Sequence, residues 1–218
     1  MKAMPRDTQQ LIQSLSRSVP RVPRHALQLR LALGMLAGAL VTLALVTRVL
    51  GVNPHLATAM HGFSFWMKLI YSLSIGVGAF IATARLARPT DRSWRWMAAL
   101  GVPFLLLAGI GIGELARAPV SEWLAMWLGR SWKMCPWLVL TLALPIFAGL
   151  LWSFRRLAPT QLRAAGAAAG LTAGAWAAAV YCLHCPETTA VFVLTWYTLG
   201  MALASLVGAL LGPRLLRW

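Results

Sequence analysis

Two cysteines of this 218-residue chain each stand directly before a proline, at Cys135-Pro136 and at Cys185-Pro186. A long apolar run follows each proline, and proline is favoured in the first turn of a helix because its missing N–H would be unpaired there anyway. The pattern predicts that each cysteine lies at or beside a helix start. The positive end of a helix dipole favours the thiolate, which is the nucleophilic and metal-binding form of cysteine.

A pair of thiolates at neighbouring helix starts predicts a site for Zn²⁺ or another thiophilic metal ion. A reversible disulfide and a catalytic dithiol are the alternative uses of such a pair. Ordinary roles also exist for the neighbouring residues, because a carboxylate in the first turn of a helix complements its dipole and a free cysteine often packs as a small apolar side chain. The predicted metal ligands are Cys135, Cys185, His184, Glu187, Cys182 and His61.

The segment Cys182-Leu183-His184-Cys185 also has the Cys-x-x-Cys spacing of thiol oxidoreductases. A membrane thiol-disulfide oxidoreductase is therefore an alternative function. Quinone-linked disulfide oxidases use two cysteine pairs, however, and this chain has three cysteines. The sequence contains no Ser/His/Asp set, no paired carboxylates and no phosphate-binding glycine loop, so we predict that the protein is not an enzyme.

The composition predicts a polytopic membrane protein, because 59% of the residues are hydrophobic and 11% are charged. The net charge is +15, and most of the 20 basic residues fall near the ends of apolar runs on one side. This distribution indicates membrane orientation and no direct nucleic-acid partner. We predict an all-α bundle of six transmembrane helices in a lipid bilayer, with both termini cytoplasmic and the three cysteines on the opposite side. The predicted spans are residues 30–50, 64–85, 96–116, 134–154, 162–182 and 187–211.

We divide the chain into a polar N-terminal arm, residues 1–28, and a transmembrane domain, residues 29–218. Leu11, Ile12 and Leu15 in the arm share one face of a predicted short helix. So few apolar residues cannot stabilise a short helix alone, which favours either a partner-binding element or a tail lying on anionic lipid. Within the domain, Gly166 and Gly170 begin a repeat of glycine at every fourth position that predicts a close helix contact.

The last 40 residues resemble those of the NrsF family, the membrane-bound negative regulators of extracytoplasmic-function sigma factors in proteobacteria. The segment His184-Cys185-Pro186-Glu187 carries the resemblance, followed by Trp196-Tyr197 and the closing residues 210–218. In outline the resemblance covers the whole chain, with a short arm, six spans, and one cysteine opening the fourth span and another opening the sixth.

This resemblance implies an anti-sigma factor of the bacterial inner membrane that sequesters an extracytoplasmic-function sigma factor. It implies that Cys135 and Cys185 face the periplasm and sense metal or oxidative stress, and that Cys182 lies outside the family pattern. It also implies that the cytoplasmic portion, where the arm contributes Leu11, Ile12 and Leu15, holds the sigma factor. The sequence leaves open whether the protein acts as a monomer or as a homodimer.

Overall fold

The structure is a computed structural model, and it describes residues 10, 13, 26–87, 98, 100–154 and 161–216. The predicted sigma-contacting residues Leu11, Ile12 and Leu15 lie outside the described residues. Every regular element of the described chain is helical, as the all-α prediction requires. The elements are α2 (Ala26–Leu45) with the π-helical turn η1 (Val46–Leu50), α3 (Leu56–Met60), α4 (Phe63–Leu86), α5 (Gly101–Arg117), α6 (Val120–Leu128), α7 (Cys135–Phe154), α8 (Leu162–Tyr181), and α9 (Ala190–Phe192) continued by η3 (Val193–Tyr197) and α10 (Thr198–Leu215).

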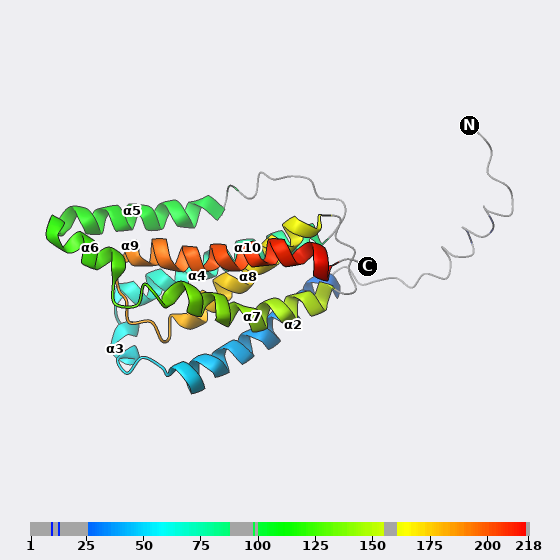
Figure 1. The fold of residues 1–218 in the computed structure, drawn as a ribbon, viewed down its shortest axis with the longest axis horizontal. Coiled ribbons are helices and arrows are strands. Elements are labelled where there is room, and N and C mark those ends of the chain that lie inside the picture. The colour runs from blue at the N-terminus through cyan, green and yellow to red at the C-terminus, as the bar shows by residue number, and fades with distance from the viewer. Residues whose placement is uncertain are drawn as a thin grey trace.

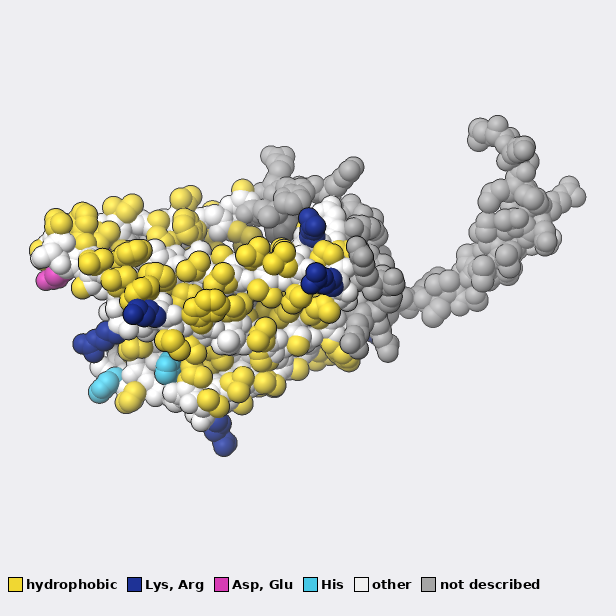
Figure 2. Space-filling model, viewed as in Figure 1, with side chains coloured by type: hydrophobic (Ala, Val, Ile, Leu, Met, Phe, Trp, Pro, Cys, Tyr) yellow, Lys and Arg dark blue, Asp and Glu magenta, His cyan; other side chains and the backbone are white. Residues whose placement is uncertain are grey.

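Five of the helical segments are long and apolar enough to cross a membrane. Their bounds lie within a few residues of five predicted spans, and hydrophobic side chains cover most of the flank of the bundle (Figure 2). The predicted third span corresponds to α5, which has 17 residues and is not among these five. A helix of this length extends about 25 Å, somewhat less than a hydrocarbon core of about 30 Å. The crossing candidates are Gln28–Leu50, Phe63–Leu86, Cys135–Phe154, Leu162–Tyr181 and Ala190–Leu215.

Helix α8 lies at the centre of the bundle and packs most extensively on α10. A side chain at Gly166 would meet the backbone of Gly208 and Gly212, and one at Gly170 would meet the carbonyl of Ala204. The two backbones therefore approach as closely as the glycine repeat predicts. Ser205 adds a hydrogen bond across the same contact, from Oγ to the carbonyl of Ala167 at 3.0 Å.

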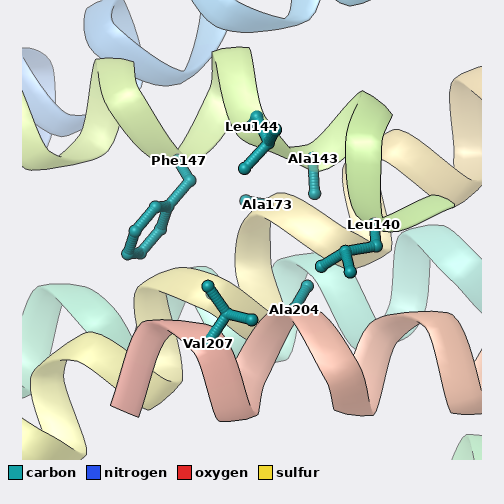
Figure 3. Close-up of a pocket in the computed structure, with 8 residues that line it drawn as sticks. Leu140, Ala143, Leu144, Phe147, Ala173, Ala204 and Val207 are labelled. Atoms are coloured by element: carbon teal, nitrogen blue, oxygen red, sulfur yellow. The ribbon is translucent and has the colours of Figure 1, made fainter. Parts of the chain in front are cut away.

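Helix α7 covers the α8–α10 pair. Figure 3 shows Leu140 and Phe147 of α7 turned toward Ala173 of α8 and Val207 of α10, around an apolar cavity of about 10 Å³. So small a cavity means that the three helices fit closely. On its other side α7 packs against α2, where Thr42 Oγ1 donates to the carbonyl of Leu142 at 2.9 Å.

Helix α4 packs on another part of α8, where the hydroxyls of Thr83 and Thr172 are 3.0 Å apart. Figure 1 shows that α2 begins and α10 ends at the same end of the elongated bundle. The start of α7, the end of α8 and α3 lie at the opposite end, which we call the cysteine end because it carries Cys135, Cys182 and Cys185.

Candidate functional site

Cys135 occupies the helix start that the sequence predicts. It is the first residue of α7, and its N–H donates to the carbonyl of Ser131 at 2.9 Å in the preceding turn. Pro136 follows in the first helical turn, where its lack of an N–H costs nothing. The Cys-Pro pattern therefore identifies this helix start correctly.

The same prediction is wrong for Cys185. The last helical segment begins at Ala190, with Thr189 as its N-cap, and residues 185–189 are not helical. Cys185 instead follows the end of α8, where its N–H donates to the carbonyl of Tyr181 at 3.0 Å. The start of the last helix thus lies four residues beyond Pro186 and does not act on the Cys185 thiol.

Lys68 holds the non-helical segment after Cys185 against α4. This lysine of α4 is 3% exposed, and its ammonium donates to the carbonyl of Cys185 at 3.1 Å and to the carbonyl of Glu187 at 2.7 Å. These two hydrogen bonds tie the non-helical segment after Cys185 to α4. The sequence analysis did not single out Lys68, although a lysine within the apolar run of residues 64–85 is the kind of signal that marks a buried charge.

The ordinary role that the sequence allows for Glu187 is to complement the dipole of the last helix from its first turn. The Glu187 carboxylate does not face the start of the last helix, so that interpretation is wrong. Its Oε1 accepts hydrogen bonds from the backbone N–H groups of Arg130 and Ser131, at 2.8 and 3.1 Å, and from the Ser131 hydroxyl at 3.1 Å. Glu114 Oε2 accepts from the N–H of Ala190 at 2.7 Å, which places the carboxylate at the start of the last helix.

The three thiols gather with two tyrosines in the interior of the cysteine end. Cys135, Cys182 and Cys185 are each at most 2% exposed, and all three are free thiols. The hydroxyl of Tyr181 lies within hydrogen-bonding reach of both Cys135 and Cys185. We call Cys135, Cys182, Cys185, Tyr181 and Tyr197 the thiol–phenol cluster.

Tyr197 contributes the second phenol from the last helical segment. It belongs to the π-helical turn η3, a form of helix that is often found at functional sites. Its hydroxyl faces the thiols of Cys182 and Cys185. It is buried without a hydrogen bond of good geometry. A buried hydroxyl without a hydrogen bond is energetically costly. The Tyr197 O–H is therefore available to donate a hydrogen bond to a neighbouring sulfur whose chemical state changes.

The predicted metal ligands do not form a metal site. Within the described ranges no group of three or more His, Cys, Asp and Glu side chains is placed to hold a metal ion. The Glu187 carboxylate is hydrogen-bonded to the loop before α7, and His184 Nδ1 is hydrogen-bonded to the carbonyl of Gly51 at 2.8 Å. His61 is exposed at the end of α3. The three thiols are thus the part of the predicted ligand set that the fold brings together.

Comparison with known proteins gives one consistent result. The profile of the family NrsF, "Negative regulator of sigma F", matches residues 15–218. The "Probable anti-sigma-F factor NrsF" of Azospira oryzae is 41% identical over 212 residues, covering 97% of this chain and 99% of that protein. The "Anti-sigma-F factor NrsF" of Caulobacter vibrioides is 38% identical over 212 residues, with the same coverage. No solved structure matches the chain significantly.

Proposed function

Because the chain belongs to the NrsF family, we propose that it is a membrane-embedded anti-sigma factor and not an enzyme. Its partner is a sigma factor of the extracytoplasmic-function type, which it holds inactive at the bacterial inner membrane. Two relatives named as anti-sigma-F factors, aligned over nearly the whole chain, support this function. Five apolar helices long enough to cross a bilayer support the location.

The end of the bundle where α2 begins and α10 ends faces the cytoplasm in this proposal, with α5 as a sixth span. The polar arm, residues 1–28, then reaches the sigma factor directly. Leu11, Ile12 and Leu15 supply the apolar face that the sigma factor binds, because a short helix of this kind gains its stability from a partner surface.

The cysteine end then faces the periplasm and receives the signal. Cys135 and Cys185 are the sensing pair, and thiophilic metal ions or oxidants from outside are the signal. The observation that supports this role is the gathering of three buried free thiols around Tyr181 and Tyr197, at the end far from the start of α2. A thiol that is modified in so tight a cluster no longer fits between its neighbours.

A change at the cluster can act at the other end because its members belong to helices that run the length of the bundle. Cys135 opens α7, Tyr181 closes α8, and Tyr197 leads into α10. These three helices pack on one another through small residues, so a shift of one displaces the others. To change a sigma factor from 99% bound to 99% free, the signal must favour the releasing state by about 5.5 kcal/mol.

Sedimentation of sigma factor with membranes tests the anti-sigma function. Membranes that contain the full chain are expected to retain the sigma factor, and replacement of Leu11, Ile12 and Leu15 by alanine is expected to release it into the supernatant. Gln10→Ala is the matched control, since this exposed polar residue lies in the same segment. Wild-type membranes that retain no sigma factor would refute the function, and retention by the triple variant would exclude the arm as the binding element.

The alternative of a thiol-disulfide oxidoreductase has less support. Both relatives are named as regulators, and neither name describes an enzyme. We therefore do not propose turnover of a substrate at Cys182 and Cys185.

A further inference from the structure

A cavity of about 110 Å³ opens at the cysteine end between α3, the start of α4 and the segment that follows α8. Cys182 and Cys185 both line it, together with Lys68, Asn53 and Thr188. Cys135 is not among the described residues that line this cavity. The cavity therefore distinguishes two of the three buried thiols, although all three are equally hidden from the surface.

The volume limits what can enter. About 10–15 Å³ of such volume is enough for one water molecule, so a cavity of about 110 Å³ has room for hydrogen peroxide. Tyr181 lies within the thiol–phenol cluster, beside Cys135 and Cys185. A small oxidant in the cavity consequently meets Cys185 or Cys182 before it meets Cys135.

The local chain also suits a bond between the two lining thiols. Cys182 and Cys185 are three residues apart in a helical turn, where the N–H of Cys182 donates to Ala178 at 3.1 Å and that of Cys185 donates to Tyr181 at 3.0 Å. Side chains at this spacing have Cβ atoms about 5–6 Å apart. A disulfide needs about 3.5–4.5 Å, so closure requires only a small movement of Cys185. No helical hydrogen bonds restrain the non-helical residues after Cys185, and the hydrogen bond from Lys68 to the Cys185 carbonyl is the contact that closure must accommodate.

We propose that this cavity is an oxidation site at which a small uncharged peroxide reaches Cys185 and Cys182 closes a disulfide with it. In the first step the Cys185 sulfur takes one oxygen from hydrogen peroxide, which forms a sulfenic acid and releases water. In the second step the Cys182 sulfur attacks the sulfenic sulfur, the S–S bond forms, and a second water leaves. Overall the two thiols give up two electrons and two protons, and one hydrogen peroxide is reduced to two water molecules.

Disulfide closure gives Cys182 a role that the family resemblance did not, and it leaves the Cys135 thiol free. It also changes the contact of the Cys185 sulfur with the Tyr181 hydroxyl, which lies beside Cys135 as well. Closure at the cavity does not require a bound sigma factor, so a test of it does not depend on the proposed anti-sigma function.

Tryptic mapping of the purified full chain after treatment with hydrogen peroxide distinguishes the two possible disulfides. Cys135 lies in the tryptic peptide 134–155, whereas Cys182 and Cys185 share the peptide 164–214. The expected product is peptide 164–214 lighter by two hydrogen atoms, with peptide 134–155 still open to alkylation. Cys135→Ala is expected to give the same product, and Cys182→Ala is expected to give none.

A covalent link between peptides 134–155 and 164–214 would overturn the proposal, because it would place the bond between Cys135 and a cavity thiol. Oxidation of Cys135 alone, or full alkylation of all three cysteines after peroxide treatment, would overturn it as well. A larger probe gives a second check, since tert-butyl hydroperoxide is expected to oxidise the pair more slowly than hydrogen peroxide in a cavity of this size. Equal rates for the two peroxides would contradict entry through the cavity.

Discussion

Lys68 fixes the path of the chain through the cysteine end. Its ammonium joins α4 to two carbonyls of the segment after α8, over a sequence separation of 117 residues to Cys185. One ammonium donates to both carbonyls, and this shared donor holds them near each other. The position of the Cys185 thiol in the cluster therefore depends on a residue of a different helix.

Replacement of Lys68 by methionine removes both hydrogen bonds while keeping an unbranched apolar stem. A buried acceptor left without a donor costs about 1–3 kcal/mol, partly offset here by the removal of a buried charge. We expect faster hydrogen–deuterium exchange of residues 182–190 in detergent, together with a lower midpoint of thermal unfolding. Lys133→Met is the control, because Lys133 is exposed. Equal exchange in the two variants would mean that Lys68 does not hold the segment.

Glu187 performs a similar task for Cys135. Its carboxylate binds the backbone of Arg130 and Ser131 in the loop that leads into α7. The loop turns at Gly129, where φ is +56° and a side chain would meet the Glu187 carboxylate, so glycine is required there on both grounds.

The variant Glu187→Ala leaves the loop before α7 without its acceptor. We expect a loss of about 1–3 kcal/mol in stability and faster alkylation of Cys135 in peptide 134–155. Glu122→Ala removes an exposed carboxylate of α6 and is expected to change stability by no more than about 0.5 kcal/mol. If Cys135 reacts at the same rate in both variants, the loop does not protect this thiol.

At the scale of the elements, α8 is the helix on which the others assemble. In lipid there is little hydrophobic driving force between helices, so close backbone contact between small residues supplies the packing energy. Gly166, Gly170 and Gly208 provide that contact between α8 and α10. The pair forms the rigid connection between the thiol–phenol cluster and the other end of the bundle.

Gly170→Ala tests this contact with the smallest possible change. The added methyl group would meet the carbonyl of Ala204, which belongs to a helix backbone and cannot rotate away. We expect a loss of about 1–3 kcal/mol, measured as a lower thermal midpoint in detergent. Gly113→Ala is the matched control, since nothing lies within 4 Å of its added carbon atom. A Gly170→Ala protein as stable as the Gly113→Ala protein would show that the contact is not close.

The sequence predicted most of the elements because hydropathy and small-residue spacing are properties of continuous segments. Five spans, the start of α7 at Cys135 and the glycine contact of α8 all follow from local patterns. The start of the last helix did not follow, because Lys68 and Glu114 act on it from other helices. Tyr181 and Tyr197 were not among the predicted site residues for the same reason, since their place beside the thiols depends on how α8 and the last helix pack.

At the scale of the whole molecule, the reactive thiols are confined to one end of the helix bundle. The thiol–phenol cluster lies at one end of the bundle, and α2 starts at the other (Figure 1). Helices α7, α8 and α10 carry or adjoin members of the cluster and run toward that far end, and α4 is joined to Cys185 through Lys68. This arrangement suits a protein that receives a thiol-directed signal on one side of a membrane and releases a partner on the other.

Release of the sigma factor from membranes treated with N-ethylmaleimide tests this account most directly. Alkylation adds bulk to a thiol without forming a disulfide, so the result is independent of oxidation at the cavity. We predict that membranes with the wild-type chain or with Cys182→Ala lose most of their bound sigma factor, while membranes with the Cys135→Ala Cys185→Ala variant retain it. Equal loss from the double variant and the wild type would contradict the claim that these two thiols control the sigma factor.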